Sequence, residues 1–302
     1  MVTPELSVII PTFEREDLLE MAVGSVAAQE AVGPVEVIVV NDGPTALDAQ
    51  RYASMNNRVT LRIVEYGQGA GPAAARNVAI DRAEGRYIAF LDDDDIFLPR
   101  HISAGCEVLD RDEADFVYLG AAVSDSRLAP PVCLPDDVAV KAYPYDYNVL
   151  LVVNYIHTGS VIVRNFRNSG VRFDESLEVC EDWDLWLALT STLGYRVSFV
   201  DELTSVYHQM PSVRGLVSEA QLASPTRFAT TREHVHSKWF SDDPQVLHYR
   251  AWMTAFEDYR SQLVARERRM PNLLFDNVLK YVHTRMAANA PADLADIPRF
   301  FS

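Results

Sequence analysis

The chain has 302 residues, and 27 Lys and Arg stand against 43 Asp and Glu, a formal net charge of -16 at pH 7. The hydrophobic fraction of 48% is enough for a folded core and excludes a largely disordered chain. The acidic balance argues against a general nucleic-acid binder, which needs a basic surface, and gives no support for binding to anionic lipid.

The sequence carries no signal for secretion or membrane insertion. Residues 1–5 lack the basic start and apolar stretch of a secretory signal, and no apolar run approaches the roughly 20 residues that cross a bilayer. The three cysteines are scattered and form no CxxC pair, as is usual in a reducing compartment. We therefore expect a cytoplasmic protein without an integral membrane segment, with peripheral attachment to a membrane left open.

The first half of the chain alternates short apolar runs with segments of helical spacing. Strands are predicted at residues 6–10, 35–40, 59–64 and 87–91. Helices are predicted at residues 18–26, 72–83 and 102–109. Strands separated by such helices predict βαβ units, and therefore an α/β fold with a mostly parallel central sheet flanked by helices.

The second half is less regular and ends in helices. Further strands are predicted at 116–122, 161–164 and 196–200, with a Pro- and Asp-rich loop at 129–147. A helix is predicted over 183–190, with Gly194 as its cap, and three more at 218–239, 245–266 and 272–288. We therefore predict one domain over 1–215, with halves 1–110 and 111–215, and a C-terminal helical region over 216–302.

Polar residues follow the predicted strands at the edge where a parallel sheet binds ligands. They are Thr12, Asn41, Asp42, Glu65 and the run Asp92 to Asp95. An isolated acidic run is usually a solvated loop. Here apolar sequence on both sides draws the carboxylates toward the core, where like charges raise each other's pKa. A divalent cation relieves that repulsion, so the run predicts binding of Mn2+ or Mg2+.

The glycines Gly67, Gly69 and Gly71 do not form a dinucleotide fingerprint, because they follow the third predicted strand and Pro72 takes the last glycine's place. Neither a P-loop nor a G-x-S-x-G motif is present in the sequence. The three glycines are either a flexible loop before a helix or a loop that lets a ligand approach Arg76 and Asn77.

Several motifs, in order, resemble family 2 glycosyltransferases and together cover roughly residues 5–210. They are SVIIPTFER at 7–15, VVNDG at 39–43, AARN at 74–77, GRYIAFLDDDD at 85–95, FDE at 173–175 and EDWDLWL at 181–187. The resemblance implies a GT-A fold, a nucleotide-sugar donor bound by the half at 1–110, an acceptor half at 111–215, a divalent metal and inversion at the anomeric carbon.

The same resemblance assigns donor and metal residues. The donor residues are Pro11, Thr12, Phe13, Glu14, Arg15, Asp42 at the nucleotide base, Arg76, Asp92 and Asp93. The metal ligands are Asp94, as the first choice, Asp92 and His208, although His208 also suits a structural role. Asn41 stands where the family commonly has an acidic residue, and Pro44 where it has serine, which leaves the nucleotide open.

Asp182 corresponds to the family's general base, which would take the proton of the acceptor hydroxyl in one in-line displacement. The alternative is an ordinary acidic residue in the first turn of a helix, favoured there by the helix dipole. By resemblance and position we assign His157, Glu181 and Trp183 to acceptor binding. Glu181 could be mistaken for the base, and Trp183 fits the core equally well.

The leading hypothesis is an inverting hexosyltransferase that uses a UDP-sugar or, as a second choice, a dTDP-sugar. The alternatives are a non-catalytic domain that binds a nucleotide or glycan, and a sugar-nucleotide pyrophosphorylase, which would need a glycine-rich loop after the first strand. The acceptor could be a glycan, a lipid-linked glycan or a small molecule. We expect no nucleic-acid partner, and a homo-oligomer through the C-terminal helices is a further expectation.

Overall fold

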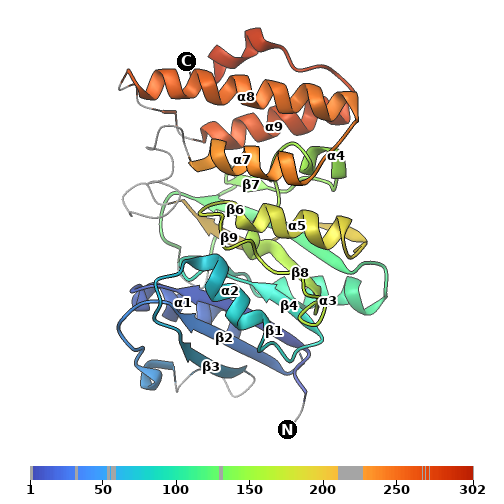
Figure 1. Cartoon of the computed structure of the whole chain (residues 1–302). Helices are drawn as coiled ribbons and strands as arrows, with labels where there is room; N and C mark the ends of the chain where they lie inside the picture. Colours follow the sequence, from blue (N-terminus) through green and yellow to red (C-terminus); the bar gives the residue numbers. More distant parts are fainter. Residues whose placement is uncertain are drawn as a thin grey trace. The chain divides into compact units, whose positions relative to one another are not determined.

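The computed structural model describes residues 3–30, 33–52, 55, 59–128, 132–209, 227–266, 268, 270–271 and 273–301 (Figure 1). The chain forms two compact units. Unit 1 comprises Met1–Tyr145, Ile156–Ser176 and Ala188–Pro211, and unit 2 comprises Asp146–Tyr155, Leu177–Leu187 and Ser212–Ser302. The FDE motif therefore belongs to unit 1, whereas the EDWDLWL motif belongs to unit 2.

Unit 1 holds one mixed sheet. Its strands are β1 (Leu6–Thr12), β2 (Val35–Asn41), β3 (Val59–Glu65), β4 (Tyr87–Phe90), β5 (Ile96–Phe97), β6 (Phe116–Ser124), β7 (Ala139–Lys141), β8 (Val161–Arg164) and β9 (Val197–His208). Their order is β3-β2-β1-β4-β8-β6-β9-β5, and β7 pairs with β6. The pairs among β1 to β4 are parallel, as is β6 with β9, and the remaining pairs are antiparallel. The predicted α/β fold is confirmed, and the sheet becomes mixed beyond β4.

Three predictions about strands need correction. β9 does not stop at Val200 but continues to His208, pairing with β6 through a register shift next to Gly120. The charged residues Asp201 and Glu202 interrupt its apolar pattern, which hides the continuation in the sequence. β5 and β7 have two and three residues, too few for a periodic pattern, and β7 lies in the segment predicted to be a loop.

The helices of unit 1 cover the sheet. They are α1 (Glu16–Ala27), α2 (Pro72–Ile80), α3 (His101–Asp110) and the short 3-10 helices η1 (Ala49–Tyr52) and η2 (Thr158–Ser160). Leu19 and Val23 of α1 and Leu109 of α3 join one core cluster with apolar residues of β1 and β2. Burying these apolar side chains stabilises the packing of the helices on the sheet.

Unit 2 is helical. It contains α4 (Tyr147–Leu150), the start of α5 (Glu181–Ser191), α7 (Arg227–Lys238), α8 (Pro244–Val264), α9 (Leu274–Ala287) and the 3-10 helix η3 (Leu294–Phe301). The predicted C-terminal helices are confirmed within the described residues, and positions 218–226 of the first one lie outside them. Trp252 and Phe256 of α8 form the core with Phe300 of η3. In the part of the chain that the structure describes, no helix is long and apolar enough to cross a membrane.

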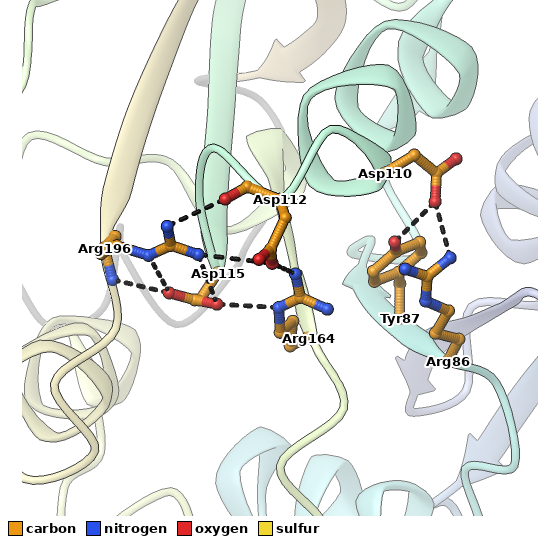
Figure 2. A network of polar contacts seen from close by, with 7 residues as sticks. All are labelled: Arg86, Tyr87, Asp110, Asp112, Asp115, Arg164 and Arg196. Atoms are coloured by element: carbon orange, nitrogen blue, oxygen red, sulfur yellow. Dashed lines mark hydrogen bonds and ion pairs between the residues drawn. The ribbon is translucent and has the colours of Figure 1, made fainter.

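An ionic network ties three strands together at the start of β6 (Figure 2). Asp115 Oδ1 accepts a hydrogen bond from Arg164 Nε at 2.7 Å, and its Oδ2 accepts one from Arg196 Nε at 2.9 Å. Asp115 immediately precedes β6, Arg164 ends β8 and Arg196 immediately precedes β9. The hydrogen bonds from Arg196 and Arg164 lower the pKa of Asp115 to about 2.

Because that pKa is lowered, the ionised carboxylate of Asp115 stabilises the fold above about pH 4, and this contribution is lost as the pH falls toward 2. Arg196 is 53% exposed, so solvent screens part of the interaction. We expect Asp115→Asn to lower the free energy of unfolding by about 1 kcal/mol at pH 7, and by less at pH 3. Urea denaturation at both pH values measures this, with Glu113→Gln as the control. An equal loss at both pH values would contradict the prediction.

Candidate active site

The parallel register brings the ends of β1, β2 and β3 together. Thr12 lies opposite Asn41, and Asn41 lies opposite Glu65. The chain beyond each strand continues the pairing, because Asp42 N donates to Thr12 O at 2.9 Å and Leu91 N donates to Ile9 O at 3.0 Å. The polar residues that follow the strands therefore gather at one edge of the sheet in unit 1, as the sequence predicts.

The three glycines after β3 form a loop that folds back onto β2. Gly67, Gly69 and Gly71 have φ values of 61°, 60° and 93°, a backbone conformation that residues with a side chain rarely adopt. Gly67 N donates to Asn41 O, Gly69 N to Asp42 O and Gly71 N to Asp42 Oδ2. These hydrogen bonds define the loop, so its function is to surround Asp42 rather than to act as a flexible tether.

Asp42 is 3% exposed, and its two carboxylate oxygens differ. Oδ2 accepts the hydrogen bond from Gly71 N at 2.7 Å, whereas Oδ1 is buried and has no hydrogen-bond partner among the residues that the structure describes. A buried acceptor without a donor is costly, which marks Oδ1 as a position for a ligand N–H or O–H. Phe13, directly after β1, is 46% exposed and provides a free aromatic face in the same unit.

Asn41, the departure from the family pattern, builds the turn around Asp42. Its Nδ2 donates to Glu65 Oε2 at 2.5 Å and to Thr45 O at 2.7 Å, and its Oδ1 accepts from Gly43 N at 3.1 Å. All three hydrogen bonds join Asn41 to neighbouring residues of the same loop and strand edge. The amide at this position therefore stabilises the loop.

Arginines neutralise three of the four consecutive aspartates. Arg76 Nη2 donates to Asp92 Oδ1 at 2.5 Å, and Arg15 Nη1 donates to Asp94 Oδ2 at 2.9 Å. Arg15 also pairs with Asp93, which accepts a further hydrogen bond from Thr12 Oγ1 at 2.6 Å. Burial nevertheless raises the pKa of Asp93 to about 7 against the opposing charge of Arg15. Asp93 thus serves to hold Thr12 and Arg15 in place.

Asp95, which belongs to the predicted cation-binding run but is not among the ligands that the resemblance assigns, completes an acidic cluster. Its Oδ1 accepts from His208 N at 2.8 Å, and its Oδ2 lies 3.1 Å from His157 Nε2. Within the described residues, carboxylate oxygens of Asp92, Asp94 and Asp95 all lie within 4.8 Å of one another. The acidic run in the sequence indicates a cation site, but with four adjacent aspartates it does not indicate which three place their carboxylates close together.

The cluster has the electrostatics expected of a cation site. Burial, followed by the charges of Asp94 and Asp92, raises the pKa of Asp95 well above its usual value. Burial also raises the pKa of Asp94. Burial acts in the same direction on Asp92, but the charges of Arg76, His157 and Arg15 and the hydrogen bond from Arg76 together lower the pKa of that carboxyl. A set of carboxylate oxygens is the ligand type that Mg2+ and Mn2+ prefer, so the residues present fit such an ion. The ion expected from the sequence therefore has a suitable set of ligands.

His208 requires a correction to the predicted ligand set. Its Nδ1 lies 2.7 Å from Asp94 O, and its Nε2 accepts a hydrogen bond from Leu128 N at 3.1 Å. An Nε2 that accepts leaves the proton on Nδ1, which then donates to the carbonyl oxygen. Burial lowers the pKa of His208, which favours this neutral form. With both nitrogens occupied by the backbone, His208 shapes the acidic loop and offers the metal no free ligand atom.

Arg76 and Asn77 connect α2 to the FDE motif. Asn77 Nδ2 donates to Phe173 O at 3.0 Å and to Glu175 Oε1 at 2.9 Å, and Asn77 Oδ1 accepts from Phe173 N at 2.9 Å. The Arg76 guanidinium lies over the Phe173 ring, 5.3 Å from its centroid. These contacts hold Arg76 in the orientation in which it reaches Asp92.

The predicted base and acceptor residues other than His157 belong to unit 2. Asp182 is half-buried in the first turn of α5, next to the buried Glu181 and Trp183. Trp183 Nε1 donates to Leu150 O at 2.6 Å, so this indole has a structural role in the core of unit 2. The roles of Asp182, Glu181 and His157 in catalysis or acceptor binding stay predictions.

Comparison with known proteins identifies the family of the N-terminal part. Residues 7–129 match the family model described as Glycosyl transferase family 2. The Succinoglycan biosynthesis protein ExoO of Rhizobium meliloti is 31% identical over 222 residues, which are 68% of this chain and 61% of that relative. Residues 7–129 are therefore a family 2 glycosyltransferase domain, and the chain spans less than two thirds of this relative's length.

Two solved structures have a similar fold. The TarS fragment 1-349 of S. aureus, in complex with UDP-GlcNAc, has a TM-score of 0.57 and 20% identity over 85% of this chain and 72% of that one. The mannosyltransferase PcManGT of Pyrobaculum calidifontis, in complex with GDP-Man and Mn2+, has a TM-score of 0.59 and 19% identity over 88% and 74%. At these identities the likeness concerns the fold alone, and it confirms the GT-A fold.

The acidic cluster predicts how Mn2+ binding depends on Asp95. We expect Asp95→Asn to raise the dissociation constant for Mn2+ at least about ten-fold, roughly 1.4 kcal/mol, because one charged ligand is lost. Titration with Mn2+ followed by electron paramagnetic resonance measures this, and the exposed carboxylate of Glu107, changed to Gln, is the control. Unchanged affinity in the Asp95 variant would remove this residue from the site.

Proposed function

We propose that the chain is an inverting glycosyltransferase that moves a hexosyl group from a nucleoside diphosphate sugar to an acceptor hydroxyl. One observation carries the proposal. A buried carboxylate with an unused oxygen, Asp42, and the acidic cluster Asp92, Asp94 and Asp95 lie at the same edge of the sheet in a family 2 glycosyltransferase domain. The first suits a nucleotide base, and the second suits a cation that binds a diphosphate.

The geometry around Asp42 favours a uracil or thymine base. Gly71 N occupies Asp42 Oδ2, which leaves Oδ1 as the free acceptor. Uracil and thymine present one ring N–H to such an acceptor, whereas guanine presents two adjacent donors that suit a carboxylate with both oxygens free. The exposed ring of Phe13 would stack on the base. We therefore propose a UDP-sugar, with a dTDP-sugar as the second choice.

The acidic cluster would hold Mn2+ or Mg2+ through Asp94, Asp92 and Asp95. When bound, the ion neutralises the charge of the diphosphate leaving group and orients it. Arg15 and Arg76 keep the carboxylates in place by pairing with Asp94 and Asp92. The chain's net charge of -16 makes the cation necessary for tight donor binding, because the diphosphate is itself an anion.

The proposed reaction is a single displacement with Asp182 as the general base. The acceptor oxygen bonds to the anomeric carbon as the bond from that carbon to the phosphate oxygen breaks. The nucleoside diphosphate leaves with the bonding electrons, and the hydroxyl proton passes to the Asp182 carboxylate. This role rests on the EDWDLWL motif, in which Asp182 is the second residue.

A glycan hydroxyl is the acceptor that we favour, because a relative of this chain carries the name of a protein of succinoglycan biosynthesis. A lipid-linked glycan or a small molecule would undergo the same reaction at its hydroxyl, and would differ from a free glycan only in the groups around that hydroxyl. The homo-oligomer and the cytoplasmic location stay predictions.

Nucleotide binding tests the donor site. We expect UDP to bind in the presence of Mn2+ and at least about ten-fold more weakly without it, because carboxylates and diphosphate repel each other. Asp42→Asn should weaken UDP binding, and it should reduce the preference for UDP over GDP. Calorimetric titration of UDP, dTDP and GDP with and without Mn2+ measures both effects. If none of these nucleotides binds under either condition, the proposed donor site is wrong.

Sugar release tests the base. We expect Asp182→Asn to lower transfer, or hydrolysis of the UDP-sugar when no acceptor is supplied, by about 100-fold or more. The affinity for UDP should stay within about two-fold, because the donor residues belong to unit 1. Glu178→Gln, at an exposed carboxylate of unit 2, is the matched control. A fully active Asp182 variant would exclude this residue as the base.

A further inference from the structure

The carboxylate of Asp182 is held by a side chain that the family motifs do not include. Asn154 Nδ2 donates to Asp182 Oδ2 at 3.0 Å, and Trp183 N donates to Asp182 Oδ1 at 2.8 Å. Asn154 and Asp182 both belong to unit 2. We infer that Asn154 is a positioning residue that orients the Asp182 carboxylate for proton transfer. The inference rests on the proposed role of Asp182 as the general base.

The segment that carries Asn154 is fixed by three consecutive carbonyl groups. The carbonyls of Leu150, Leu151 and Val152, at the end of α4, accept hydrogen bonds from Trp183 Nε1 at 2.6 Å, Arg250 Nε at 2.9 Å and His236 Nε2 at 3.0 Å. Carbonyls at a helix end lack partners within the helix, so side chains from α5, α8 and α7 satisfy them here. The backbone two residues before Asn154 is therefore attached to three helices of unit 2.

A second set of contacts fixes the other end of the segment. Asp146 caps α4, because its Oδ1 accepts from Asn148 N at 2.8 Å and from Val149 N at 3.2 Å. Tyr155, directly after Asn154, is buried and donates from its hydroxyl to Asp146 O at 3.0 Å. The loop from 151 to 155 is thus closed on both sides, and Asn154 has little freedom to move.

The start of α5 is fixed independently of Asn154. Asp184 is buried, and its two oxygens accept from Lys238 Nζ and Trp239 Nε1, each at 2.7 Å. Trp183 is held by its bond to the Leu150 carbonyl. The two residues after Asp182 are therefore anchored, and the Asp182 carboxylate itself is oriented by Trp183 N at Oδ1 and by Asn154 at Oδ2.

The amide of Asn154 is suited to that task. An asparagine amide donates through its N–H groups, and each carboxylate oxygen can accept more than one hydrogen bond. The bond to Oδ2, together with the bond from Trp183 N to Oδ1, therefore fixes the plane of the carboxylate. A hydrogen bond to the ionised form also favours that form, which is the form that a general base needs.

Two variants test the inference. Asn154→Ala removes the donor, and Asn154→Asp keeps the size of the side chain but replaces the N–H donor with a second carboxylate. We expect Asn154→Ala to lower kcat about 10-fold with the KM for the UDP-sugar within about two-fold. The acidic limb of the pH profile should move up by about one pH unit, and further in Asn154→Asp, because a like charge disfavours ionisation. Asn148→Ala, in the same segment, should leave kcat and the pH profile unchanged.

The outcomes separate this inference from the proposed function. An inactive Asp182→Asn together with a wild-type kcat and pH profile in Asn154→Ala would overturn the inference alone. A loss of kcat in Asn154→Ala without a shift of the acidic limb would also overturn it, because that result indicates a structural role. A fully active Asp182→Asn would overturn the proposed base and with it the role of Asn154. The 13C resonance of the Asp182 carboxyl, assigned with Asp182→Asn, gives a readout without turnover, and an unchanged titration midpoint in Asn154→Ala would overturn the inference.

Discussion

Four consecutive carboxylates at the end of β4 are the constraint around which unit 1 is arranged. Like charges held close together near a core are costly, and each of the four has a compensating partner. Arg76 pairs with Asp92, Arg15 pairs with Asp93 and Asp94, and the backbone of His208 donates to Asp95. These partners come from α2, from the turn before α1 and from the end of β9. The need to neutralise the acidic loop therefore fixes the relation between segments far apart in the sequence.

The arginines and backbone groups do not satisfy every carboxylate oxygen, and the oxygens that remain are the ones available to a ligand. Burial and mutual repulsion raise the pKa of Asp95. Its Oδ2 lies 3.1 Å from His157 Nε2 but receives no hydrogen bond of acceptable geometry within the described residues. Asp42 Oδ1, at the same edge of the sheet, likewise has no hydrogen-bond partner among the described residues. Buried acceptors that the protein leaves unsatisfied are positions where a ligand gains most, because it supplies a missing charge or hydrogen bond. In unit 2, by contrast, both carboxylate oxygens of the buried Asp184 accept hydrogen bonds, and this residue anchors the start of α5.

Long elements carry a clear pattern in the sequence, and short ones do not. β1, β2 and β3 have seven residues each, and their apolar runs predict them, as the apolar face of α5 predicts that helix. β5 has two residues, and no periodicity exists over that length. The motif that contains Asp42 gave the correct strand end. The motifs do not predict the role of His208, because its ring donates from Nδ1 to Asp94 O and accepts at Nε2 from Leu128 N, and both partners are far away in the sequence.

The sequence by itself determined the α/β fold, the edge of the sheet where polar groups gather, and the acidic run that suits a cation. Those features depend on local periodicity and on residues adjacent in the chain. Only the tertiary structure decided which aspartates share one space, that Asp93 is used by Thr12 and Arg15, and that Asn154 donates to Asp182. The reason is physical: side-chain direction and the choice of hydrogen-bond partner depend on segments that meet only when the chain is packed.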